Sequence, residues 1–139
     1  MSLFTRALLV GCVGISSWAS ALDCENAIST LEMNECAFAE SKKLEDTLAS
    51  YFAKAIEILQ ETEESEAAAA LEKSQASWLT YRNDYCDAIY QLWIGGSIRS
   101  IMASACSHKL TYERTLTIWQ DYLVTMDGHE FLPEPKKPK

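Results

Sequence analysis

Residues that interrupt helices are scarce in this sequence. Of its 139 residues, five are glycine and three are proline, and the prolines all follow residue 132. Residues 15–94 contain neither. Because glycine and proline are the strongest helix breakers, long uninterrupted helices are expected in that part of the chain. Convincing strand-like alternation and internal repeats are also missing, which argues against a β-rich or repeat architecture.

Basic residues are few as well. Twelve Lys and Arg stand against twenty Asp and Glu, which gives a formal net charge of −8. Nucleic acids and anionic membrane surfaces both select basic faces, so the composition argues against either as a partner. A basic partner is permitted, although such acidity also simply keeps an exported protein soluble.

The main apolar run covers residues 7–18. It is too short to cross a bilayer as a permanent helix, which takes roughly 20 residues, and no later segment approaches that length. Arg6 precedes the run and Ala19-Ser20-Ala21 follows it. These are the three parts of a secretory signal. We therefore predict a signal peptide over residues 1–21 and a soluble mature protein in the periplasm or outside the cell.

Cleavage after Ala21 leaves 118 residues, enough for one domain. It removes Arg6, so that 11 Lys and Arg face 20 Asp and Glu, a net charge of −9. A lipid anchor on Cys12 is the alternative, because Leu9-Val10-Gly11-Cys12 resembles a lipoprotein-processing box. Only residues 7–11 separate Arg6 from Cys12, which is short for the apolar core of a signal, so this alternative is disfavoured.

Residues that bind metals or carry out catalysis form no recognisable pattern. The only histidines, His108 and His129, are 21 residues apart, and we expect both to be exposed to solvent. The cysteines lack zinc-site spacing, and no nucleophile with a base or carboxylate pair in a cleft can be identified. We expect no metal, no cofactor and no enzymatic activity.

Apolar periodicity predicts three helices, over residues 31–60, about 62–94 and 97–128. Ser29 and Glu32 have the spacing of a capping box at the first start, acidic residues 63–66 mark the second, and Ser97 is expected to cap the third, which ends at Gly128. The expected inward residues of the second and third helices are Leu71, Gln75, Trp78, Arg82, Tyr85, Cys86, Ile89, Leu92 or Trp93, then Ile98, Met102, Ala105, Tyr112, Leu116, Trp119 and Leu123. Residues 22–128 would form the domain, and residues 129–139 a disordered tail with proline and lysine.

The four cysteines of the mature chain predict two disulfides in an oxidising compartment. Cys86 lies 9 residues before Gly95 and Cys106 lies 10 after Gly96. Folding the chain at the glycines therefore brings their sulfurs to within about 1.5 Å along the axis. A break near Ser29 lets Cys24 reach Cys36. The predicted fold is an elongated antiparallel three-helix bundle with two disulfides, rigid at the glycine turn and looser at the turn at residues 61–66.

One group of polar residues belongs to the expected inward face. Gln75, Trp78 and Arg82 share one side of a helix, and a buried arginine must be hydrogen-bonded or paired. The glycine turn brings Arg82 near Lys109 and Leu110. We interpret Gln75, Trp78, Arg82, Glu113 and Arg114 as a structural network that fixes helix register, with Glu113, or Glu32 and Glu35, as acceptor. Ligand binding is the less favoured interpretation.

Ordered motifs along nearly the whole mature chain resemble a known family, the lysozyme inhibitor LprI-like proteins. The motifs are Glu32-Met33-Asn34-Glu35-Cys36-Ala37, Gln75-x-x-Trp78-x-x-Tyr81-Arg82-x-x-x-Cys86, Gly95-Gly96-Ser97, and Cys106 with Leu110-Thr111-x-x-Arg114. Lipid-anchored members carry a clear lipobox, whereas the processing site here reads Ala19-Ser20-Ala21.

The resemblance implies an exported, helical, disulfide-bridged protein that inhibits lysozyme or a related peptidoglycan hydrolase by binding. A basic lysozyme would be attracted by the acidic chain. The glycine turn, with Tyr90, Trp93, Ile94, Ser97 and Arg99, is the expected contact surface, although Trp93 could equally pack beneath the N-terminal segment. The rival interpretation is a structural or interaction module of the cell envelope without lysozyme activity. A hydrolase would need converging carboxylates in a pocket, which tightly packed helices rarely provide.

Overall fold

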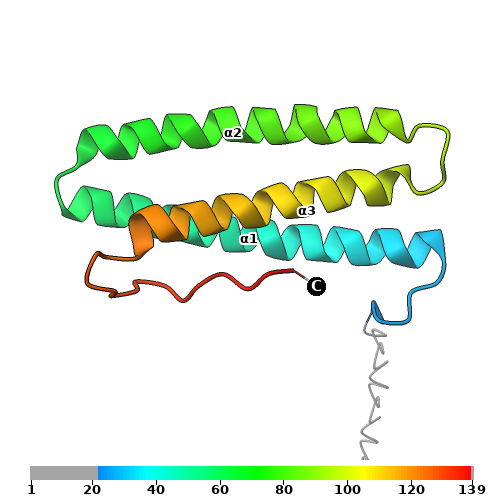
Figure 1. The fold of residues 1–139 in the computed structure, drawn as a ribbon, viewed down its shortest axis with the longest axis horizontal. Helices are drawn as coiled ribbons and strands as arrows, with labels where there is room; N and C mark the ends of the chain where they lie inside the picture. The colour runs from blue at the N-terminus through cyan, green and yellow to red at the C-terminus, as the bar shows by residue number, and fades with distance from the viewer. Residues whose placement is uncertain (1–21, 139) are drawn as a thin grey trace, which may run out of the picture.

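The computed structural model describes residues 22–138 and contains three long helices that run antiparallel (Figure 1). They are α1 (Thr30–Glu61), α2 (Ser65–Leu92) and α3 (Arg99–Ile118), followed by the short π-helical turn η1 (Trp119–Leu123). In residues 22–138 the only β pairing is a single bridge between Val124 and Glu130. The predicted all-α bundle is confirmed. The predicted signal peptide lies outside the described residues.

Both predicted disulfides are present. Cys24 is bonded to Cys36 and Cys86 to Cys106, each with Cα atoms 5.6 Å apart. The α2–α3 turn and the start of α1 lie at the same end of the bundle (Figure 1), which we call the disulfide end. Within residues 22–138, no helix is both long and apolar enough to cross a bilayer.

The helix starts differ in how they are capped. The Ser29 capping box is confirmed, since its hydroxyl accepts from the Glu32 amide at 3.2 Å and the Glu32 carboxylate accepts from the Ser29 amide at 2.9 Å. The prediction that Ser97 caps the third helix is wrong. Ile98 is the N-cap residue, because its carbonyl accepts the first helical hydrogen bond, from the Met102 amide. No side chain caps this helix start.

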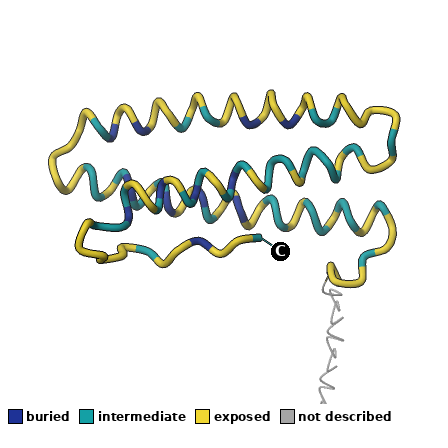
Figure 2. The backbone as a smooth tube through the Cα atoms, viewed as in Figure 1, coloured by how far each residue is buried: buried dark blue, intermediate teal, exposed yellow. Residues whose placement is uncertain are grey.

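The hydrophobic core occupies the half of the bundle that holds the α1–α2 turn (Figure 2). Its fully or nearly fully buried members come from late α1, early α2 and the region after Thr117, namely Leu48, Tyr51, Ala55, Leu71, Ile118 and Leu123. The expectation that this half is the looser one stays a prediction, although the half contains the core cluster. Apolar burial stabilises this half, whereas covalent bonds hold the disulfide end.

Two of the expected inward faces are narrower than the periodicity predicted. Tyr85 and Leu92 are 48% and 76% exposed, and Ala105 is exposed as well. α2 packs mainly against α3 and much less against α1, so only a narrow stripe of α2 is covered. On α3 the buried face is centred on Thr111, Thr115 and Ile118.

The third helix ends earlier than predicted. It stops at Ile118, η1 follows, and Val124 has extended backbone. Thr125 then forms a tight turn: its amide donates to the His129 carbonyl at 2.9 Å, and its hydroxyl accepts from the His129 amide at 3.0 Å. These local hydrogen bonds compete with helix propagation. Gly128 does not end the helix but lies within this turn, with φ of +85°.

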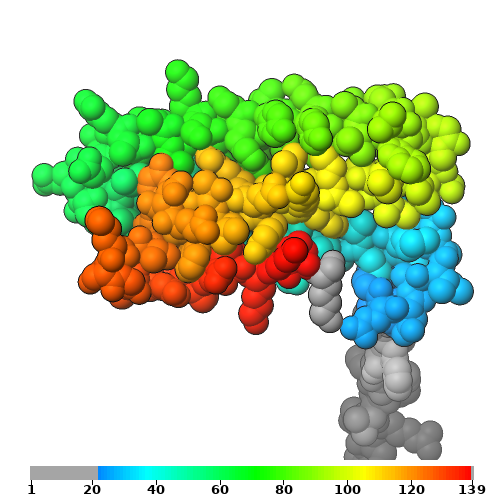
Figure 3. Space-filling view, viewed as in Figure 1, coloured from blue at the N-terminus to red at the C-terminus, as the bar shows by residue number. Residues whose placement is uncertain are grey.

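The last residues, predicted as a disordered tail, contact the helical bundle. After the turn, residues 132–138, which we call the C-terminal segment, run back along the bundle toward the disulfide end (Figures 1 and 3). The indole Nε1 of Trp119 donates to the Leu132 carbonyl at 2.8 Å, and Pro135 is buried. Composition alone suggested disorder because it does not reveal side chains on other elements that bind the segment.

Candidate functional site

Arg82 links all three helices. From α2, its Nη1 donates to the Thr111 hydroxyl on α3 at 3.1 Å and lies 3.2 Å from the Glu45 carboxylate on α1. Its guanidinium carbon lies 5.3 Å from the centre of the Trp78 ring. Glu45 therefore supplies the carboxylate that we expected from Glu113, Glu32 or Glu35. The two expected residues of α1 are wrong because Glu32 and Glu35 lie in its first two turns, whereas Arg82 is level with the middle of α1, where Glu45 lies.

A second polar contact joins α2 and α3 nearby. Arg114 Nε donates to the Gln75 side-chain oxygen at 2.9 Å, and its Nη2 donates to the Ser74 hydroxyl at 3.1 Å. Burial lowers the pKa of Arg114 from its usual value. Glu113 does not take part: its nearest cation is Lys109 on the same exposed helix face, at 3.9 Å. The expected network is thus two separate ties, one through Arg82 and one through Arg114.

The Arg82 tie yields a stability prediction. Glu45 is about half exposed, with 54% of its side chain accessible, so it keeps its hydration and the ion pair contributes little. We expect Glu45→Gln to change the free energy of unfolding by less than about 0.5 kcal/mol. Arg82→Ala should cost about 2 kcal/mol, because the guanidinium loses its position over the Trp78 ring and the Thr111 hydroxyl loses its donor. Urea unfolding of both variants measures this, and equal costs would contradict it.

His108 is not the exposed residue that we predicted. Its Nε2 lies 2.7 Å from the Ser41 hydroxyl oxygen and 3.0 Å from the Ala37 carbonyl oxygen on α1. A serine beside a histidine is the start of a nucleophilic pair. The Ser41 hydroxyl, however, donates to the Ala37 carbonyl at 2.9 Å, so its proton is directed to the backbone and not to Nε2. The contact is a tie between α1 and α3.

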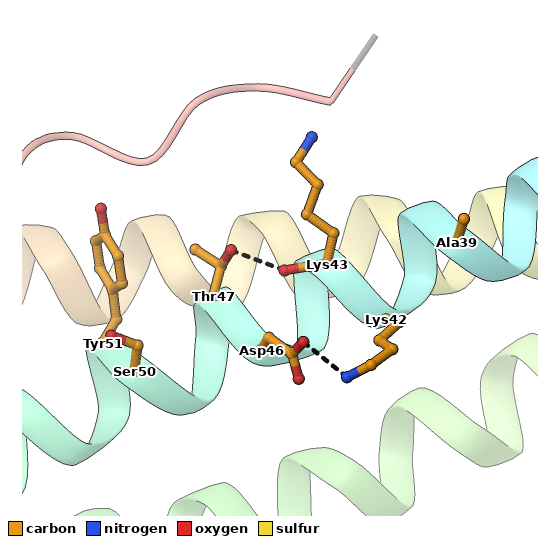
Figure 4. A pocket seen from close by; sticks show the side chains of 7 residues that line it. All are labelled: Ala39, Lys42, Lys43, Asp46, Thr47, Ser50 and Tyr51. Carbon is orange, nitrogen blue, oxygen red and sulfur yellow. Dashed lines mark hydrogen bonds and ion pairs between the residues drawn. The ribbon is translucent and has the colours of Figure 1, made fainter. Parts of the chain in front are cut away.

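Other potential sites lack convergent chemistry. Among residues 22–138, no group of three or more His, Cys, Asp or Glu is placed to hold a metal ion. A shallow hollow of about 580 Å³ lies on α1 (Figure 4). Its Lys42 and Asp46 form an exposed ion pair of 2.8 Å within the helix, and the Thr47 hydroxyl donates to the Lys43 carbonyl. These groups satisfy one another and do not converge on a common point.

The residues expected to contact a partner lie together at the α2–α3 turn. We call Tyr90, Trp93, Ile94, Ser97 and Arg99 the turn surface. Arg99 organises it: Nε donates to the Tyr90 hydroxyl at 2.8 Å, Nη1 donates to the Ile94 carbonyl at 3.3 Å, and the guanidinium lies over the Tyr90 ring. The Trp93 and Ile94 side chains are 39% and 53% exposed.

Exposed apolar side chains gather around the turn surface. Of the thirteen large apolar residues exposed between residues 22 and 138, eight lie in residues 22–38 or 92–98. They are Leu22, Ile28, Leu31, Phe38, Leu92, Trp93, Ile94 and Ile98. Both segments lie at the disulfide end (Figure 1). Concentrated exposure of this kind is typical of an interaction surface.

We did not predict the contribution of α1 to this surface. Leu31 and Phe38, which are 68% and 73% exposed, are seven residues apart and therefore share a helix face, away from the buried stripe at Leu44 and Leu48. That spacing was the available signal. Residues 22–38 also carry four carboxylates and no basic side chain. The disulfide end is therefore apolar and acidic.

Comparisons with known proteins agree with the motifs. The sequence model of a family described as "Lysozyme inhibitor LprI" matches residues 23–117, more than half of the chain. An uncharacterized protein of Rhizobium meliloti (strain 1021) is 28% identical over 102 residues, which covers 67% of this chain and 73% of that protein. No solved structure is significantly similar to the chain.

Proposed function

The chain belongs to the lysozyme inhibitor LprI family, and on that premise we propose that it is an exported binding protein that inhibits lysozyme or a related peptidoglycan hydrolase by blocking its substrate cleft. The two disulfides are typical of proteins outside the cytoplasm. The observation that carries the proposal is the concentration of exposed apolar side chains at the acidic disulfide end.

The turn surface is the proposed contact with the cleft. It projects at one end of the bundle, so it can enter a concave site that the long flank of α2 could not. Arg99 fixes Tyr90 through a hydrogen bond, and groups that are already ordered lose little entropy when they dock. Exposed tryptophan, tyrosine and arginine are the side chains that most often dominate binding energy.

The negative net charge of the chain favours a basic partner. The chain has a net charge of −8, and the carboxylates of residues 22–38 flank the exposed apolar residues. A basic hydrolase would be attracted over a range set by ionic strength, about 8–10 Å at physiological salt. The proposed partner is therefore a basic lysozyme.

A lysis assay tests this function directly. We expect the mature protein with intact disulfides to slow clearing of a bacterial cell-wall suspension by a basic lysozyme at stoichiometric ratio, and to do so less well as salt is raised. A soluble oligosaccharide substrate, assayed in parallel, separates inhibition of the enzyme from masking of the wall. Unchanged lysis at large molar excess would contradict the proposal and favour an envelope module without lysozyme activity.

A further inference from the structure

A groove of about 1130 Å³ runs between α1, α3 and the C-terminal segment. This volume exceeds the roughly 300–1,000 Å³ that is typical of ligand pockets. It is the space that stays open with the segment in place, so the segment occupies only one side of the interval along α1 and α3. The helix walls include Leu44, Thr47 and Tyr51 from α1, and His108, Tyr112 and Thr115 from α3. The groove extends to the Cys24–Cys36 disulfide.

Aromatic donors hold the C-terminal segment through its backbone. The Tyr51 hydroxyl donates to the Pro133 carbonyl at 2.6 Å, and the Trp119 indole donates to the neighbouring Leu132 carbonyl at 2.8 Å. Burial raises the pKa of Tyr51, which keeps its hydroxyl in the donor form. Pro135 is buried two residues further on. Backbone carbonyls, a proline ring and the Leu132 side chain, which packs against the core cluster, are thus the recognised features.

The recognised segment has the composition of a polyproline II peptide. Its sequence, Pro133-Glu134-Pro135-Lys136-Lys137-Pro138, contains all three prolines of the chain, and it forms neither helix nor strand. Proline fixes φ and removes the amide donor, so such a segment is extended before it binds and leaves its carbonyls available. Aromatic-lined grooves recognise proline-rich peptides in this way.

Charge also suits a cationic segment. Lys136 and Lys137 line the groove, and so do the carboxylates of Glu25 and Glu40. Lys43 lines it too, and its side chain extends toward the C-terminal segment (Figure 4), but Lys43 is paired with Glu40 at 3.4 Å.

We propose that this groove is a recognition site for extended peptides that contain proline and lysine, and that the C-terminal segment is its resident occupant. A segment of this chemistry from another protein binds by displacing residues 132–138 and accepting hydrogen bonds from Tyr51 and Trp119. The resident segment competes at an effective concentration of about millimolar, as expected for a short tether. A partner peptide must therefore bind the groove more tightly than the resident segment does in order to displace it at lower concentration. This site is separate from the turn surface and does not depend on lysozyme binding.

The test uses the full mature chain with Pro133, Pro135 and Pro138 all replaced by glycine, which keeps the chain length but weakens the resident segment. We expect the Trp119 indole N–H resonance to shift and its hydrogen exchange to accelerate, while the helical circular dichroism is unchanged. A synthetic peptide with the native sequence of residues 132–139 should then restore the resonance on titration. Adding Tyr51→Phe, which removes one hydrogen-bond donor with little change in side-chain volume, should lower the affinity for the peptide about fivefold.

The control peptide has alanine in place of each proline, with the same charge. The proposal predicts that it fails to restore the Trp119 resonance. Equal restoration by both peptides would overturn the recognition of proline, and no restoration by the native peptide would overturn the groove as a binding site. An unshifted Trp119 resonance in the glycine variant would show that the prolines do not hold the segment and would also overturn the proposal.

Discussion

Replacing Cys86 and Cys106 together by alanine is expected to lower the free energy of unfolding by about 3 kcal/mol. The bond closes a loop with a sequence separation of 20, and its removal restores to the unfolded chain the freedom that this closure denies. The disulfide end has few buried side chains to compensate, since the core cluster lies in the other half of the bundle. Urea unfolding under non-reducing conditions, at a concentration series that defines both baselines, measures the change.

The double variant Cys24→Ala with Cys36→Ala is the matched control. Its loop has a sequence separation of only 12, and Cys24 is exposed whereas Cys86 is 7% exposed, so we expect a smaller cost. Hydrogen exchange should accelerate most at residues 86–106 in the first variant and at residues 24–36 in the control. A loss below about 1 kcal/mol for Cys86 and Cys106 would show that helix packing, not the bond, holds the α2–α3 hairpin.

The elements that the sequence specifies locally could be predicted from it. Ser29 and Glu32 determine the start of α1 because a capping box involves only four consecutive residues. Gly95 and Gly96 indicate where the hairpin turns, and the fixed rise of a helix then brings Cys86 level with Cys106. These features need no knowledge of how the helices are rotated about their axes.

Features that depend on rotation and on distant partners could not be predicted. The carboxylate of the Arg82 tie is Glu45 on α1. Counting from the α1–α2 turn, as for the two cysteines, brings Glu45 level with Arg82, but that count does not say which face of α1 is turned toward Arg82. The C-terminal segment appeared disordered because its own composition is polar and rich in proline. Its order depends on Tyr51 and Trp119, which lie 82 and 13 residues from their acceptors.

The distribution of stabilising interactions explains where binding can occur. One half of the bundle is stabilised by apolar burial around Ile118 and Leu123, both fully buried, and fewer of the exposed large apolar side chains lie there than at the disulfide end. The disulfide end is stabilised by covalent bonds, so its apolar residues are not needed for a core and can remain exposed. Disulfides thus allow a surface that is both ordered and apolar, which a small domain without them could rarely maintain.

That arrangement leads to the strongest functional prediction, for the variant with both Trp93→Ala and Arg99→Ala. Trp93 supplies exposed apolar area, and Arg99 positions Tyr90 through a 2.8 Å hydrogen bond. Because residues of these types dominate interfaces, we expect the double variant to inhibit a basic lysozyme about a hundredfold less well. Inhibition constants from the lysis assay, with binding measured by titration calorimetry, quantify the loss.

Leu79→Ala is the matched control, because Leu79 is 38% exposed and Trp93 39%, yet Leu79 lies about 21 Å before Trp93 along the axis of α2, by helix rise. A protein that binds through the turn surface should lose inhibition in the double variant and keep it in the control, while both retain wild-type circular dichroism and both disulfides. If Leu79→Ala weakened inhibition and the double variant did not, the flank of α2 would be the contact. If neither variant lost inhibition, the contact would lie instead on the exposed face of α1 at Leu31 and Phe38. The carboxylates of residues 22–38 would then attract the basic enzyme.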